Sequence, residues 1–177
     1  MKKFEFTGET IILFGLTLKR IRALVRIELG RTVINPGDLG GWLEKESNLS
    51  HEGKAWVWGN AEVWGNAKVC GDAEVCGDAE VCGDAEVCGD AFIFRAEHLL
   101  VMGAMGSRNA FTSFFRNKKG EIKVKCGCFF GTVDQFLSKV AETHGDSKHA
   151  IVYRAAVTLA LAQLDTTPFE GDEDASR

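Results

Sequence analysis

A six-residue alternation of hydrophobic and polar positions dominates the middle of the chain. From Ala55 to Asp90 the sequence reads AWVWGN, AEVWGN, AKVCGD and then AEVCGD three times, and the degenerate unit AFIFRA follows. In each unit an aliphatic residue is followed four places later by alanine, and glycine with Asn or Asp lies between them. These residues tolerate the left-handed backbone of a tight corner. A period of six therefore predicts a short strand plus a corner, with three such sides completing one turn of a coil.

Coiling would stack residues that are eighteen apart, at roughly the 4.8 Å spacing of neighbouring strands. One outward face would then be markedly more apolar than the other two, and exposed aromatic groups of this kind mark an interface. The alternative is that the terminal segments fold back and cover this face. The two columns expected on it are Trp58, Cys76 and Phe94, and Trp56, Glu74 and Phe92. The interface candidates are Trp56, Trp58, Trp64, Phe92 and Phe94.

The flanking segments have other periodicities. Residues 1–38 alternate well enough to predict short strands. After the hexads, FTSFFR and IKVKC flank NKKGE, which predicts a hairpin. Thr132 with Gln135 forms a capping box that opens a helix over 133–144, Gly145 ends it, and residues 146–164 form a second helix with an apolar face.

The hexads resemble the hexapeptide-repeat, left-handed β-helix superfamily of trimeric acyltransferase-like proteins, in which an aliphatic residue points inward and a small residue fills each corner. Together with HEGKAWVWGNAEVWGNA, the segments FEFTGET and GDLGGWLEKESNLS look like hexapeptide-repeat proteins carried by bacteriophages and prophages. The resemblance extends over most of the chain. It implies a viral or mobile-element context and says little about chemistry.

The expected fold class is mainly β: a short left-handed parallel β-helix with a β-rich N-terminal cap and a C-terminal α+β module. The expected segments are a cap over 1–38, the hexapeptide-repeat β-helix over 39–96, the α+β module over 97–164 and a disordered acidic tail over 165–177. Assembly as a homo-oligomer, a trimer or a dimer, would use the coil faces or the terminal modules.

Composition suits one or two small domains, since 45% of the 177 residues are hydrophobic and 26% are charged. No run of eighteen apolar residues and no apolar leader follows Met1, so we expect a cytoplasmic protein (the bacterial host cytoplasm, if phage-encoded) without a membrane partner. The net charge of −4 conceals unlike segments: residues 1–35 carry +4, 36–91 carry −9, 92–164 carry +5 and the rest −4. An anionic ligand should prefer the first or third segment.

The third segment is where a small-molecule site is most plausible from sequence. The loop GAMGSRN supplies flexible glycines, the hairpin adds cations, and the predicted start of the first helix has free amides that favour anions. Phenylalanines interleave with these cations and could stack on a base, although such a stripe is more often core. The anion or nucleotide candidates are Ser107, Arg108, Asn109, Arg116, Lys123, Lys125 and Thr132.

No metal or cofactor is expected. Four of the six cysteines repeat with one spacing and no export signal accompanies them, so they are expected to be reduced. Stacked thiols such as Cys70 over Cys88 could bind a soft metal, but no partner set with zinc-like spacing lies near them. Cys126 and Cys128 supply only two ligands.

Catalysis has no positive sequence evidence. An acyltransferase using acyl-coenzyme A would need a histidine base, and only His51 and His98 flank the hexads. We therefore expect a non-catalytic phage-type binding protein that acts against a host defence component, by binding a host protein or by sequestering a small nucleotide-like signal. The alternatives are the acyltransferase and a purely structural oligomeric scaffold. Direct nucleic-acid binding is not expected, because an acidic array interrupts the basic segments.

Overall fold

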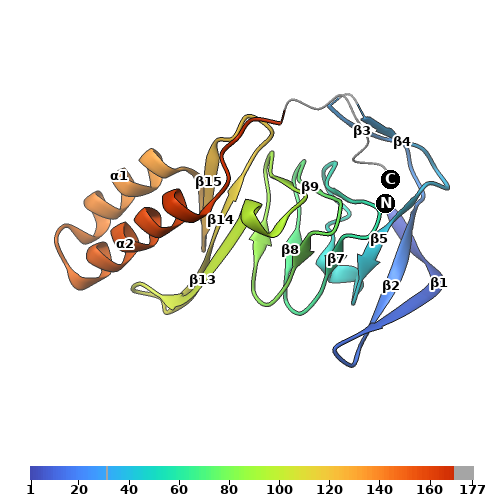
Figure 1. Ribbon diagram of the computed structural model, residues 1–177, viewed down its shortest axis with the longest axis horizontal. Coiled ribbons are helices and arrows are strands. Elements are labelled where there is room, and N and C mark those ends of the chain that lie inside the picture. Colours follow the sequence, from blue (N-terminus) through green and yellow to red (C-terminus); the bar gives the residue numbers. More distant parts are fainter. Residues whose placement is uncertain (31, 170–177) are drawn as a thin grey trace.

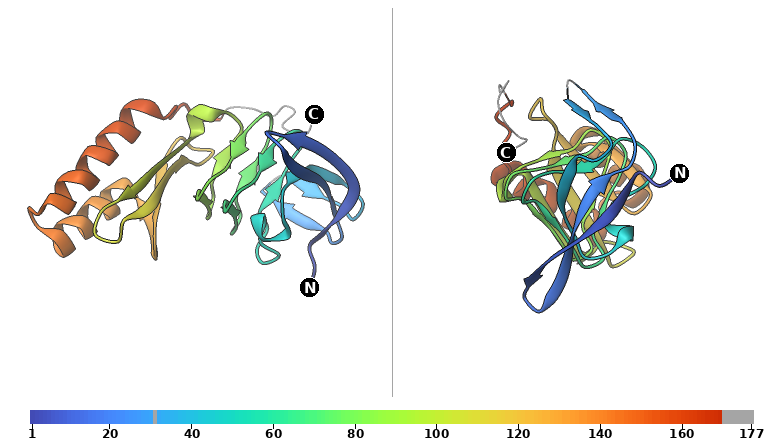
Figure 2. Two further views of the ribbon diagram at one scale, coloured as in Figure 1. Left: turned by 90° about the horizontal axis from the view of Figure 1, so that it is seen from below. Right: turned by 90° about the vertical axis from the view of Figure 1, so that its right-hand side faces the viewer.

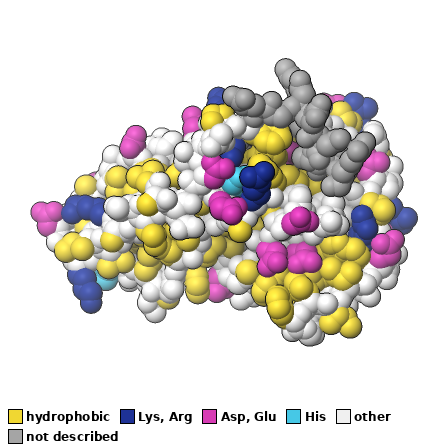
Figure 3. Space-filling view, in the orientation of Figure 1, with side chains coloured by type: hydrophobic (Ala, Val, Ile, Leu, Met, Phe, Trp, Pro, Cys, Tyr) yellow, Lys and Arg dark blue, Asp and Glu magenta, His cyan; other side chains and the backbone are white. Residues whose placement is uncertain are grey.

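The computed structural model describes residues 1–30 and 32–169. Its long axis follows the order of the chain: the first strands lie at one end, the hexads in the middle, and the two helices at the other end (Figure 1). Figure 2 shows the same succession from below, with a sheet standing between the hexads and the helices. On the face seen in Figure 3, hydrophobic side chains are exposed in patches, with acidic side chains among them over the middle.

The N-terminal part folds as hairpins that close one end of the hexads. Strands β1 and β2 pair antiparallel, β2 pairs antiparallel with β5, and β3 with β4 forms a separate two-stranded sheet. Their apolar residues, among them Phe4, Ile21 and Ile34, join the hexad valines in one core. The bounds are β1 Phe4–Leu13, β2 Leu16–Ala23, β3 Ile27–Leu29, β4 Thr32–Ile34, β5 Leu39–Leu43 and the 3-10 helix η1 Glu46–Asn48.

Each hexad contributes one two-residue strand whose valine or isoleucine is buried. Strands eighteen residues apart pair in parallel, as the spacing predicts: β7 pairs with β10, β8 with β11, and β9 with both β6 and β12. The bounds are β6 Trp56–Val57, β7 Glu62–Val63, β8 Lys68–Val69, β9 Glu74–Val75, β10 Glu80–Val81, β11 Glu86–Val87, β12 Phe92–Ile93 and the 3-10 helix η2 Ala96–His98.

The C-terminal part is a four-stranded antiparallel sheet, β13-β14-β15-β16, backed by two helices. Side chains of β14 alternate between two cores, because Phe115 packs with the hexad valines whereas Phe114 packs with the helices. The bounds are β13 Leu99–Met105, β14 Ala110–Arg116, β15 Ile122–Cys126, β16 Phe129–Thr132, α1 Val133–His144 and α2 Lys148–Gln163. The predicted hairpin and the predicted helix over 133–144 are confirmed, including the Thr132–Gln135 capping box.

The expected fold class is wrong. The described residues are not mainly β; they form a mixed α/β structure with many short strands in several small sheets and two helices. Two features account for the difference. The hexad strands are only two residues long and divide among three sheets, one of which continues into the antiparallel strands β5, β2 and β1. The helices, of 12 and 16 residues, are the longest elements among the described residues.

The chain after α2 returns along β14 toward the hexads (Figure 1). Asp165 N–H donates to the Glu97 carbonyl at 3.0 Å, and Phe169 N–H donates to the Lys118 carbonyl at 2.9 Å. We call residues 164–169 the strap. Within the tail expected over 165–177, Asp165 and Phe169 therefore contact the body of the protein. Residues 170–177 lie outside the described residues.

Among the residues that the structure describes, no helix is both long enough and apolar enough to cross a membrane.

Candidate anion-binding site

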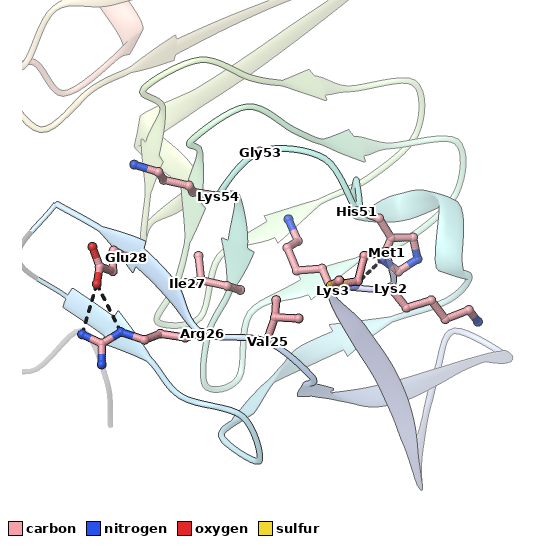
Figure 4. Close-up of a pocket in the computed structure, with 10 residues that line it drawn as sticks. All are labelled: Met1, Lys2, Lys3, Val25, Arg26, Ile27, Glu28, His51, Gly53 and Lys54. Carbon is pink, nitrogen blue, oxygen red and sulfur yellow. Dashed lines mark hydrogen bonds and ion pairs between the residues drawn. The ribbon is translucent and has the colours of Figure 1, made fainter.

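A pocket of about 360 Å³ opens where the first residues of the chain meet β3 and the loop that leads into the first hexad. Four of its ten lining residues are lysines or arginines, and the single carboxylate among them is Glu28. Figure 4 shows that these residues come from three separate stretches of the sequence. The lining residues are Met1, Lys2, Lys3, Val25, Arg26, Ile27, Glu28, His51, Gly53 and Lys54.

Lys3 is the buried cation of this pocket, with 3% of its surface exposed. Its Nζ donates a hydrogen bond to the Ala55 carbonyl at 2.7 Å. Burial lowers the pKa of Lys3 from 10.5 to about 8, and the nearby Asp72 carboxylate offsets only part of this effect. A buried ammonium with one carbonyl partner retains unused donors, so a bound anion would relieve its desolvation.

His51 anchors the chain beside Lys3. Its Nδ1 accepts a hydrogen bond from the Lys3 backbone N–H at 3.1 Å, and its Nε2 lies 2.8 Å from Glu46 Oε1. The ring also stacks on Phe4, with centroids 4.5 Å apart. Hydrogen bonds from Lys2 and His51 lower the pKa of the Glu46 carboxyl. His51 is therefore a structural residue of the site, with both ring nitrogens already engaged.

Gly53 permits the loop to approach the hexads closely. Its φ is +70°, and a Cβ at this position would lie 2.4 Å from the Gly71 carbonyl oxygen. The neighbouring Lys54 N–H donates to that same carbonyl at 2.8 Å. The loop thus lies flat against a hexad corner, which leaves the Lys54 side chain at the rim of the pocket.

Two exposed cations complete the rim. Arg26 pairs with Glu28 at 3.1 Å, with both side chains more than half exposed. Such exposed pairs contribute little energy, so the Arg26 guanidinium can exchange this partner for a ligand. Within residues 1–30 and 32–169, Lys54 has no ion-pair partner. The pocket therefore presents an excess of positive charge beside apolar surface from Val25 and Ile27.

The seven ligand candidates from the third segment do not converge on a pocket of this kind. Ser107, Arg108 and Asn109 lie exposed in the turn between β13 and β14. The two β15 lysines are paired, Lys123 with Glu121 at 3.1 Å and Lys125 with Glu86 at 2.8 Å. A pocket of about 260 Å³ beside this sheet includes Lys125, but Asp84 and Glu86 also line it and would repel an anion.

Thr132 and Arg116 are occupied by the fold itself. Thr132 caps α1, because its Oγ1 accepts from the Gln135 N–H at 3.3 Å and its own N–H donates to Gln135 Oε1 at 2.9 Å. Arg116 is 1% exposed, and its Nε donates to the Asn117 carbonyl at 3.1 Å. Its guanidinium also lies 3.4 Å from His98 Nε2, so the structure does not present it to a ligand.

The five interface candidates differ in their exposure. Trp56 and Phe92 are buried, with 0% and 1% of their surfaces exposed, whereas Trp58, Trp64 and Phe94 are partly exposed. Phe169 packs on Phe92 with ring centroids 4.8 Å apart, and the Lys118 ammonium lies 4.9 Å from the centroid of the Phe92 ring. The strap thus packs on the Phe92 and Phe94 part of the predicted aromatic face.

The histidines considered as bases are both engaged in the fold. His98 is 0% exposed, its Nδ1 accepts from the Phe94 N–H at 3.3 Å, and burial followed by the Arg116 charge lowers its pKa. His51 is held as described above. In the part of the chain that the structure describes, no three His, Cys, Asp or Glu side chains come together to hold a metal ion.

Sequence reasoning pointed to the charge of this region and missed the pocket. The excess of cations in residues 1–35 indicated an anion preference, but Lys3, Arg26 and Lys54 are far apart in sequence. Long-range contacts bring them together: Lys3 Nζ donates to the Ala55 carbonyl, 52 positions away, and the Lys3 carbonyl accepts from the Leu24 N–H. The unusual HEGK corner preceding the first regular hexad was the one local signal.

Comparison with models of known protein families gives no match, and neither does comparison with curated protein sequences.

Proposed function

We propose that the protein is a non-catalytic binding protein that sequesters a small phosphate-bearing ligand in the pocket between the N-terminal residues, β3 and the Ser50–Ala55 loop. The observation that carries this proposal is the buried Lys3 ammonium at the base of a pocket whose rim holds Arg26 and Lys54. Phosphate oxygens accept hydrogen bonds from both ammonium and guanidinium groups and are favoured by an excess of cations.

The dimensions of the pocket favour a ligand about the size of a mononucleotide. A volume of about 360 Å³ falls near the lower end of small-molecule sites, which run from roughly 300 to 1,000 Å³. Val25 and Ile27 supply apolar surface beside the cations, which suits a ligand with an apolar or aromatic part next to its phosphate. A nucleotide has this combination.

The pocket supports binding without turnover. His51, the one histidine that lines it, uses one ring nitrogen to accept from the Lys3 N–H and the other to contact Glu46. A general base needs a free nitrogen within reach of the reacting proton. In the phage-type setting that the sequence resemblance suggests, capture of a host nucleotide signal would be a counter-defence activity.

Native mass spectrometry tests this function with three probes: inorganic phosphate, adenosine monophosphate and adenosine, which lacks the phosphate. We expect one adenosine monophosphate per chain and no complex with adenosine. The double variant Arg26→Gln/Lys54→Gln should lose the complex, while Lys139→Gln, which removes an exposed lysine of α1, should retain it. Equal retention of adenosine, or an unchanged complex in the double variant, would contradict the proposal.

We also propose that a second copy of the chain packs on the outer side of α2. Ile151 and Leu159 are 60% and 50% exposed there, and Ala155 lies midway between them. An antiparallel copy centred on Ala155 would place Ile151 against the partner's Leu159, with the small alanines allowing the helices to approach. The exposed residues thus form a self-complementary stripe, as a two-fold interface requires.

A further inference from the structure

Two thiols meet on one edge of the hexads. Cys70 follows β8 and Cys88 follows β11, and these strands pair in parallel with Val69 beside Val87. The Cys70 N–H donates to the Val87 carbonyl at 3.0 Å, which fixes the two cysteines side by side. Neighbouring strands lie roughly 4.8 Å apart, within the range of about 4.4–6.8 Å between Cα atoms that a disulfide bridges.

The other hexad cysteines have different neighbours at the equivalent positions. Cys76 lies between Trp58 and Phe94 in its column, and Cys82 lies beside Trp64. Burial raises the pKa of the Cys76 thiol to about 12 and also raises that of Cys82. Among the four hexad cysteines, only Cys70 and Cys88 can therefore form a pair within the chain.

Cys70 is accessible from solvent through a pocket of about 450 Å³ that it lines together with Lys68, His51 and Leu49. Cys88, beside it on the neighbouring strand, is 8% exposed. This arrangement gives one thiol that a small molecule reaches and a second, buried thiol next to it. Redox-active cysteine pairs have this order of attacking and resolving thiol.

The surroundings favour the thiolate at Cys70. A hydrogen bond with the Cys88 side chain, aided by the charges of Lys125 and Lys68, lowers the pKa of Cys70 to about 7. The same hydrogen bond and burial raise the pKa of Cys88, so Cys88 keeps its proton. The thiolate is the nucleophilic form of cysteine, and a thiol with a pKa near the ambient pH is the most effective attacking group.

We propose that Cys70 and Cys88 form a reactive dithiol that a low-molecular-weight disulfide, such as glutathione disulfide, converts to an intramolecular disulfide. The Cys70 thiolate attacks one sulfur of the small disulfide, whose S–S bond breaks and releases one small thiolate. That thiolate takes the Cys88 proton. The Cys88 thiolate then attacks Cys70 Sγ and displaces the second small thiolate, which takes a proton from water. Two protein thiols are thus oxidised and one small disulfide is reduced to two thiols.

The reacting groups of this site, Cys70 and Cys88, do not line the proposed anion pocket, and their chemistry is different, although His51 lines both pockets. The disulfide would covalently link two paired hexad strands through cysteines that are eighteen positions apart. The crosslink would tie the corner after β8 to the corner after β11 and remove the thiolate from the 450 Å³ pocket.

Peptide mapping of the wild-type chain after treatment with glutathione disulfide tests the proposal without any substitution. The intact mass should fall by two hydrogens. Cleavage after Glu62, Glu74, Glu80, Glu86 and Glu97 places the four hexad cysteines in separate peptides. We expect the peptide 63–74, which holds Cys70, to be joined to the peptide 87–97, which holds Cys88. A crosslink between any other pair, or an unchanged mass, would overturn the proposal.

Single variants separate the two roles. Cys88→Ser should stop the reaction at the first step and gain one glutathione at Cys70. Cys70→Ser should leave Cys88 unmodified, and the control Cys76→Ser should form the crosslink as the wild type does. Glutathione on Cys88 in the Cys70→Ser variant, at the wild-type rate, would show that Cys70 is not the attacking thiol.

Discussion

At the scale of single residues, two buried cations, Lys3 and Arg116, differ in the groups that surround them. Lys3 donates to the Ala55 carbonyl at the base of a solvent-open pocket. Arg116 is enclosed instead: it is 1% exposed, its Nε donates to the Asn117 carbonyl, and its guanidinium lies against His98 from η2. A sequence shows only that both are cations. Which of them faces a ligand depends on residues that are remote in the chain, so Arg116 was chosen from sequence and Lys3 was not.

The lowered pKa of Lys3 has a consequence for stability. Since its pKa is about 8 in the folded protein and 10.5 as the ordinary value, the unfolded chain binds more protons between these limits. The free energy of unfolding should therefore rise as the pH increases from about 7 to about 10, by up to about 3 kcal/mol from this residue. Lys3→Met should lack this rise, as measured by denaturant unfolding at each pH. Lys2→Met, at an exposed position, should retain it, and parallel curves for Lys3→Met and the wild type would refute the assignment.

At the scale of elements, short sequence motifs predicted the features that depend on residues close together in the chain. The Thr132–Gln135 box marked the start of α1, the NKKGE turn marked the β14–β15 hairpin, and the period of six marked which strands pair. Packing between remote elements was not visible in this way. The strap covers Phe92 through Phe169, which is 77 positions further along the chain, and the sheet of β7 and β10 continues into β2 and β1.

The strap should be held mainly by its aromatic contact. Phe169 packs 4.8 Å from Phe92 and 5.6 Å from Phe94 between ring centroids. Phe169→Ala should lower the free energy of unfolding by about 1–3 kcal/mol. It should also speed hydrogen exchange of the Asp165 amide, which donates to Glu97. Thr166→Ala, at an exposed strap position, serves as the control, and unchanged exchange in Phe169→Ala would mean that the hydrogen bonds alone hold the strap.

At the scale of the whole molecule, the hexads connect two different ends. One end carries the basic pocket and the other carries the helices with their exposed apolar side chains (Figure 1). The mixed α/β class follows from these ends, since the repeat that dominates the sequence supplies only two-residue strands. The sequence repeat predicted which hexad strands pair, but it did not predict the fold class of the whole protein.

The exposed apolar side chains on the outer side of α2 lead us to predict a dimer. Ile151→Glu would place a charge in the proposed two-fold contact, opposite Leu159 of the partner subunit. We expect this variant to be a monomer and the wild type to be a dimer when their masses are measured by light scattering after size-exclusion chromatography. Ser138→Glu, on the exposed side of α1, should leave the dimer intact. A monomeric wild type, or an unchanged dimer in Ile151→Glu, would exclude this interface.

The most direct test of the central claim is calorimetric titration of adenosine monophosphate into the wild type, Arg26→Gln/Lys54→Gln and Lys139→Gln. We predict one site per chain in the wild type and in Lys139→Gln, with affinity that falls as the salt concentration rises. In the double variant the affinity should be lower by at least roughly tenfold to a hundredfold, the effect of losing one charge-assisted hydrogen bond. No saturable binding to the wild type, or equal affinities for the wild type and the double variant, would contradict the account.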